Sequence, residues 1–119
     1  MILFLAAAPF VAFSVSAQTI DHLGALSVYP NPFDSRQKAA TIEYTLDAPA
    51  EVSIDLYNLF GNEVQAWSYA AGAIGGRRGV NRQLWKGRNA HGTRVSKGIY
   101  FAVVRAGGAR RVRMIGVIH

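Results

Sequence analysis

Apolar and polar residues alternate along most of the chain from residue 26 onward, and this period of two predicts β-strands rather than helices. Seven short segments carry the alternation: residues 26–29, 41–46, 51–57, 64–69, 80–85, 99–105 and 112–118. Glycine and proline fall between these segments, with Gly116 as the exception. Gly107-Gly108 suits a tight hairpin between the last two strands, because glycine tolerates positive φ.

This succession of strands and turns predicts an all-β protein, an antiparallel β-sandwich of the immunoglobulin-like type with about seven strands. A barrel of about five or six strands is the alternative. The chain has no cysteine, so its core is expected to rest on packing alone. The side chains predicted to point inward are Ile42, Tyr44, Leu46, Val52, Ile54, Leu56, Val64, Leu84, Ile99, Phe101, Val103 and Val112.

The first 13 residues are an unbroken apolar run, too short for a bilayer, which takes about 20 apolar residues. Val15 and Ala17 have the spacing of a signal-peptidase site before Gln18. No Lys or Arg precedes the run, and a buried N-terminal strand or helix is the alternative. The predicted organisation is a signal peptide at 1–17, a short linker at 18–25 and one β-sandwich at 26–119. The protein is therefore expected to be exported and to be secreted or held at the cell surface.

Composition narrows the chemistry that the chain can perform. A length of 119 residues suits one domain. The absence of cysteine excludes a disulfide scaffold, a thiolate zinc site and a cysteine nucleophile. Thirteen Lys and Arg against seven Asp and Glu give a net charge of +6, unevenly distributed. Residues 1–63 hold two basic and seven acidic residues, whereas residues 64–119 hold eleven basic residues and no acidic one.

No constellation of residues indicates catalysis. His22, His91 and His119 lack metal-ligand spacing, and no serine has a Gly-x-Ser-x-Gly context. The glycine-rich residues 72–79 lack the strand–loop–helix setting of a phosphate cradle. Acidic residues are too scattered for a calcium site. The sequence therefore predicts no enzyme, no metal, no cofactor and no small-molecule substrate.

Four ordered motifs resemble a known family. They are YPNPF at 29–33, ATIEYTL at 40–46, VSIDLYNLFGNEV at 52–64 and LWKGRNAHGTRVSKGIYF at 84–101. Together they resemble the immunoglobulin-like domain first named for the flagellar hook-capping protein, and the C-terminal sorting domain of type IX secretion cargo in Bacteroidetes and related bacteria. The resemblance implies a seven-stranded sandwich appended to secreted enzymes, adhesins and surface proteins, which serves recognition and anchoring. The motif residues are Pro30, Asn31, Pro32, Phe33, Tyr57, Gly61, Trp85, Gly87, Asn89, Gly92, Gly98 and Tyr100.

Plain structural roles are expected for most of these motif residues. The two prolines should hold the chain extended before the next strand. Gly61 and Gly98 should stand where φ is positive or where a Cβ would clash. Trp85 and Tyr100 should close the end of the sandwich, with their polar tips reaching backbone carbonyls. Asn89, with the following Gly92, suits the turns of the long loop.

The chain departs from the family pattern in two respects. Lys86 stands where the family commonly has Asp after the Trp, and an acidic residue near Asn89 is also missing, which puts any role of a carboxylate in that loop in doubt. Such domains also normally follow a large cargo domain, whereas about ten residues separate the predicted cleavage site from this module. The chain is therefore expected to be a short gene product, a fragment of a longer protein or a free-standing secreted module.

The basic second half suggests an interaction surface. Arg111 and Arg113 share one face of the last strand, and Arg105 lies on its hairpin partner, so we expect an outward basic stripe, with Arg110 as a further candidate for interaction. The alternative is that the acidic early strands lie beside the basic late strands and neutralise their charge across the sheet. Such a surface attracts anionic polysaccharide, lipopolysaccharide, an acidic protein or nucleic acid. Nucleic acid is disfavoured because no aromatic residues are interleaved with these arginines.

Two classes of function follow. The first is a non-catalytic secreted module that secretion machinery or a cell-envelope protein recognises, through edge pairing or a patch on the hairpin at 99–118. The alternative is an extracellular module that binds anionic glycans or envelope components through the arginines.

Overall fold

A computed structural model describes residues 22–119, which form seven β-strands. The predicted signal peptide lies outside the described residues. The strands are β1 (Leu23–Tyr29), β2 (Ala40–Leu46), β3 (Val52–Asn58), β4 (Glu63–Tyr69), β5 (Gly79–Trp85), β6 (Gly98–Ala106) and β7 (Ala109–Val117). Each coincides with a predicted segment, although β1 begins three residues early, inside the predicted linker, because Leu23 is already part of the core.

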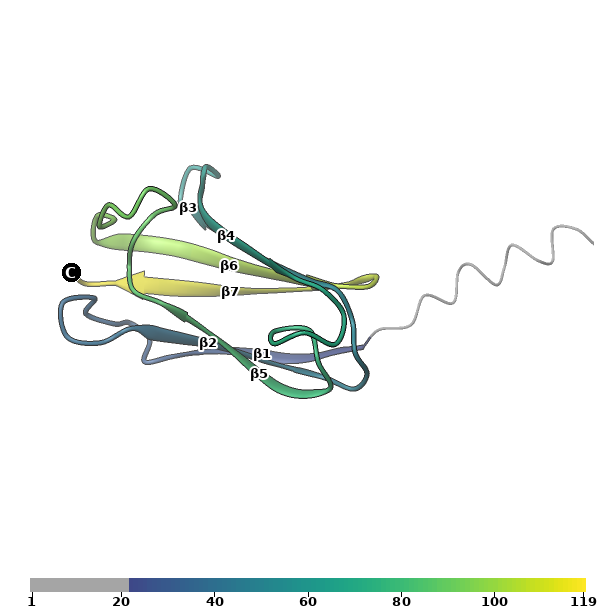
Figure 1. Ribbon diagram of the computed structural model, residues 1–119. Coiled ribbons are helices and arrows are strands. Elements are labelled where there is room, and N and C mark those ends of the chain that lie inside the picture. Colours follow the sequence, from purple (N-terminus) through teal and green to yellow (C-terminus); the bar gives the residue numbers. More distant parts are fainter. Residues whose placement is uncertain (1–21) are drawn as a thin grey trace, which may run out of the picture.

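The strands form two separate antiparallel sheets that face each other (Figure 1). One sheet has the order β1-β2-β5 and the other β4-β3-β6-β7. Residues 70–78 lead from β4 in the larger sheet to β5 in the smaller, and residues 86–97 lead back to β6. The predicted immunoglobulin-like sandwich is confirmed, and the barrel alternative is wrong.

The core lies between the sheets and is built mainly from alternate residues of the central strands. All six inward positions predicted on β2 and β3 are buried. At one end of the sandwich, Trp85 packs between Phe33 and Tyr100, with ring centroids 5.5 Å apart in both pairs. The Trp85 Nε1–H donates to the Arg88 carbonyl at 2.9 Å, and the Tyr100 hydroxyl donates to the Ser96 carbonyl at 2.7 Å. The roles predicted for both rings are confirmed.

The inward face of β6 is opposite to the one predicted. Tyr100, Ala102 and Val104 are buried against the core, whereas Ile99 and Phe101 face outward. Every residue from 99 to 104 is apolar, so alternation does not fix which face is inner. Val103 is also on the outer face, although it is only 5% exposed, and the charged Arg105 follows on the same face.

Two other core predictions are wrong for similar reasons, and a third is met in part. Leu84 is 52% exposed because its neighbour Trp85 takes the inward position on β5. Val112 is 38% exposed because β7 turns Ile115 and Val117 inward. Val64 is half-buried and packs against the margin of the core.

The orientation of the hairpin strands can be tested with one substitution at two sites. We expect Ile115→Ala, at a fully buried position, to lower the free energy of unfolding by about 2–5 kcal/mol, since it leaves a cavity. Ile99→Ala, at a position 37% exposed, should cost less than about 1 kcal/mol. Urea denaturation of both variants measures the difference. Equal losses would mean that the inner face of β6 is assigned wrongly.

Tyr44 provides a second test, through the pH dependence of stability. Its hydroxyl donates to the Gly75 carbonyl at 2.6 Å inside the core, and burial, with a contribution from nearby Tyr69, raises the pKa of Tyr44. The unfolded chain ionises this phenol near pH 10, whereas the folded chain keeps it neutral, so stability present below that pH is lost as the pH rises above it.

We expect Tyr44→Phe to cost about 1–3 kcal/mol at pH 7, because the Gly75 carbonyl loses its partner. The same variant should lose less further stability than the parent between pH 9 and about 11. Unfolding by urea across this range is the measurement. If the free energy of unfolding changes with pH equally in both proteins, the pKa of Tyr44 is not raised by folding.

Candidate interaction surface on the C-terminal hairpin

Strands β6 and β7 form a long hairpin that turns at Gly107-Gly108, as predicted, with Ala106 opposite Ala109. Because β7 is the outermost strand of its sheet, one row of its backbone N–H and C=O groups points away from the ladder. Such an edge accepts a further strand unless it is covered.

The second half of this edge is covered by the chain itself, through the YPNPF motif. The Phe33 N–H donates to the Gly116 carbonyl at 2.9 Å, and the Ile118 N–H donates to the Phe33 carbonyl at 3.0 Å. The Asn31 side chain imitates a peptide group, since its Nδ2 donates to the Met114 carbonyl at 2.7 Å and its Oδ1 accepts from the Gly116 N–H at 2.9 Å. No strand can therefore be added along this half without displacing residues 31–33.

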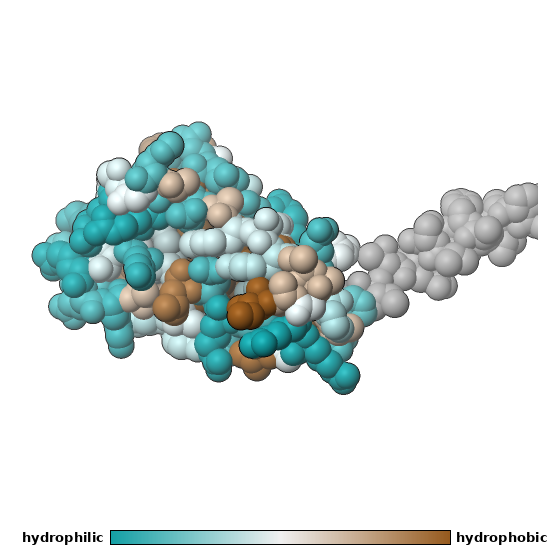
Figure 2. All heavy atoms as spheres, in the orientation of Figure 1, coloured by the Kyte–Doolittle hydropathy of each residue, from teal (hydrophilic) through white to brown (hydrophobic). Residues whose placement is uncertain are grey.

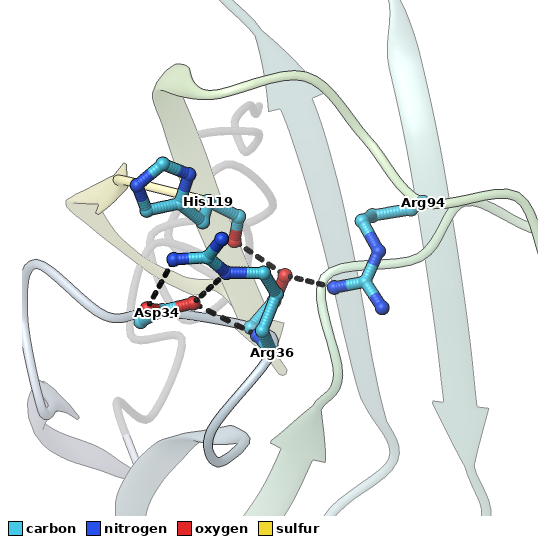
Figure 3. Close-up of polar contacts among 5 residues, drawn as sticks. Asp34, Arg36, Arg94 and His119 are labelled. Carbon is cyan, nitrogen blue, oxygen red and sulfur yellow. Dashed lines mark hydrogen bonds and ion pairs between the residues drawn. The ribbon is translucent and has the colours of Figure 1, made fainter.

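Ser35 extends this connection to the last residue (Figure 3). Its N–H donates to the His119 carbonyl at 2.9 Å, and its hydroxyl donates to the same oxygen. Arg94 Nη1 donates to Ser35 Oγ at 2.8 Å. Beside them Arg36 pairs with Asp34 at 3.2 Å, and its hydrogen bond holds the pKa of that carboxyl below its usual value. Segments far apart in the sequence thus meet at this end of the sandwich.

Guanidinium groups cover the first half of the β7 edge. Arg111 Nη2 donates to the Leu23 carbonyl at 2.7 Å, which connects β7 to β1 in the other sheet, and its Nη1 donates to the Arg110 carbonyl at 3.1 Å. Arg113 Nη1 lies 3.4 Å from the Val112 carbonyl. Basic side chains on an edge strand oppose strand addition, so edge pairing is disfavoured here as well.

The predicted single basic stripe is wrong. Arg105 lies opposite Arg110 on the outer face of the sheet, and it also forms an ion pair with Asp55 at 3.2 Å. Arg111 and Arg113 lie opposite buried β6 residues, on the other face. Because successive side chains of a strand point to opposite faces, residues 110 and 111 cannot share one.

The outer face of the hairpin carries a row of apolar side chains. Phe101 lies directly between Tyr57 on β3 and Met114 on β7. The next cross-strand pair on this face is Val103 and Val112. Met114 is 56% exposed, and at the neighbouring β3–β4 turn Phe60 is 85% exposed. By contrast, the apolar areas seen in Figure 2 are small and separated among hydrophilic side chains.

The structure brings most of the predicted motif residues to one end of the sandwich, around Trp85. Tyr57 and Gly61 stand apart, on the outer face of β3 and in the β3–β4 turn. Gly61 and Gly98 have positive φ, as predicted. The Asn89 Oδ1 accepts from the backbone N–H groups of residues 91 and 93, which confirms its role in the turn. Both motif prolines lie between β1 and β2 and follow cis peptide bonds.

Sequence reasoning missed the contacts of Asn31 and Ser35 with the end of the chain, and the hydrogen bond from Arg94 to Ser35. A polar residue between prolines signals a turn, but its partners lie more than 80 residues away. Among the described residues, no three His, Asp or Glu side chains gather as metal ligands. None of residues 22–119 belongs to a helix long and apolar enough to cross a membrane.

Comparison with known families and structures gives one matching family, and the solved structures with a similar fold include parts of two larger proteins. The model of the secretion system C-terminal sorting domain family matches residues 27–117. The fold is similar to part of PorZ, an essential bacterial surface component of the type-IX secretion system of Porphyromonas gingivalis, with TM-score 0.57 and 22% identity over 80% of this chain and 12% of that one. It is also similar to part of dimeric latent PorU from the same organism, with TM-score 0.59 and 18% identity over 82% of this chain and 10% of that one.

At these identities the two structures share the fold alone with this chain, which spans about a tenth of the length of either protein. No curated protein matches the sequence.

The side chain of Asn31 is open to a direct test. We expect Asn31→Ala to destabilise the fold by about 1 kcal/mol and to speed hydrogen exchange of the Gly116 amide, which loses its acceptor. Asn62→Ala is the matched control, since Asn62 contributes only its backbone to the β3–β4 turn. Unchanged exchange at Gly116 would show that Asn31 does not cover the strand edge.

Proposed function

The chain belongs to the family of secretion-system C-terminal sorting domains, and we propose that it acts as a non-catalytic module of type IX secretion. The family match over residues 27–117 carries this proposal. In the proposed role, the sandwich presents a surface that a component of the secretion machinery or a cell-envelope protein recognises. The protein is then exported and becomes secreted or attached to the cell surface.

The outer face of β3, β6 and β7 is the recognition surface that the geometry supports best. Both halves of the β7 edge are covered, so backbone pairing is a poor mode of recognition there. The outer face instead offers the apolar row through Phe101 and Met114, with Arg105 and Arg110 at one end. An apolar centre with charged groups at its margin is the usual composition of a protein interface.

Binding of anionic glycans by the arginines 105, 110, 111 and 113 receives less support. These side chains divide between the two faces of the sheet, and two of them hold backbone carbonyls of the β1 and β7 edges. They therefore do not form one continuous surface for a polyanion.

The proposal predicts the fate of a reporter in a bacterium that has type IX secretion. A periplasmic reporter with its own signal peptide, followed by residues 22–119, should reach the cell surface or the medium. The same fusion should stay in the periplasm when the type IX system is inactivated. Fractionation and surface labelling measure its location, and equal surface delivery in both strains would refute the proposal.

Variants of the fusion locate the recognition surface. Met114→Lys should reduce delivery, since it places a charge in the apolar row. Leu84→Lys is the matched control, because Leu84 is similarly exposed but lies on the outer face of the other sheet. If Leu84→Lys reduces delivery while Met114→Lys does not, recognition involves the smaller sheet instead.

A further inference from the structure

A hollow of about 250 Å³ opens beside the end of β5, away from the hairpin face. Ala40 pairs with Trp85, so the residues just before β2 and just after β5 come side by side. Four basic side chains line this hollow, which we call the basic cavity: Arg36, Lys38, Lys86 and Arg88. The remaining lining residues are Ser35, Gln37 and Ala39, so no acidic and no aromatic side chain is among them.

The positive charge of the basic cavity is mostly not neutralised by the fold. Asp34, the nearest acidic residue in sequence, uses both carboxylate oxygens to bind Arg36, through its backbone N–H, Nε and Nη2. Within residues 22–119, Lys38, Lys86 and Arg88 form no ion pair. Three cations therefore share one small hollow without a counter-charge.

All four basic side chains are exposed to solvent, in the segments just before β2 and just after β5. The fold nevertheless holds one of them in place, since Arg88 Nη1 donates to the Gly92 carbonyl at 2.9 Å.

We propose that the basic cavity binds a phosphate monoester carried by a larger molecule, either a phosphorylated sugar or a lipid headgroup. A phosphate monoester carries a charge of about −1.5 to −2 at neutral pH and has three acceptor oxygens, which suits three uncompensated cationic donors. The cavity is smaller than the roughly 300–1,000 Å³ of pockets that enclose a drug-sized ligand, so it holds one compact group. Without an aromatic side chain it offers no stacking surface for a nucleobase. This inference goes beyond the role in secretion and does not depend on it.

The test uses the full 119-residue chain at low ionic strength. Mannose 6-phosphate serves as the soluble probe in calorimetric titration. Phosphatidylcholine vesicles with and without phosphatidic acid serve as the lipid probe in sedimentation. We expect binding of one probe or both, with amide shifts in the nuclear magnetic resonance spectrum confined to residues 35–39 and 86–88. The probe that binds identifies the source of the phosphate.

Lys86→Asp, which reverses the charge of one lining side chain, should weaken binding about tenfold or more. Lys97→Asp is the matched control, because Lys97 is also exposed and unpaired within the described part of the chain but does not line the cavity. The affinity of the Lys97→Asp variant for the probe should stay within about twofold of that of the parent, since distant exposed charges are largely screened. Binding of neither probe, equal affinity for the parent and Lys86→Asp, or equal weakening by both variants would overturn the proposal. Reporter export by an otherwise intact fusion carrying Lys86→Asp would leave the secretion role standing.

Discussion

The position of Phe33 links the two sheets at one end of the sandwich. Its N–H donates to the Gly116 carbonyl of β7 at 2.9 Å, and its carbonyl accepts from the N–H of Ile118, just after β7, at 3.0 Å. Its ring is buried against Trp85, the last residue of β5 in the smaller sheet. Because one residue satisfies both requirements, the connection between β1 and β2 fixes the end of β7 relative to the aromatic core. The long loop that follows Trp85 is fixed by the same packing.

This constraint explains which parts of the C-terminal hairpin remain available to a partner. Residues 31–35 and two guanidinium groups already occupy the β7 edge, so the chain protects itself against uncontrolled strand addition. What remains accessible is the outer face, where β6 displays Ile99 and Phe101. In the proposed role, a partner protein would contact the side chains of this face rather than the backbone of the β7 edge.

Much of the fold could be predicted because local patterns determine it. In β2 and β3, polar residues alternate with the apolar core residues, so only one face of each strand can be the inner one. Ile42 and Ile54 lie on that face. In β6 residues 99–104 are apolar on both faces, so alternation within this run does not determine which face is inner. The hydrogen bonds of Asn31 could not be predicted for another reason, because its partners, Met114 and Gly116, lie at the far end of the sequence.

Gly87 has a consequence for the loops around the aromatic core. A Cβ built on it would lie 2.5 Å from the Ser35 Cβ, nearer than two such atoms can come. Any other amino acid at this position would force the segment around Ser35 away from the loop that follows Trp85. The close approach of these two segments therefore depends on the absence of a single side-chain carbon.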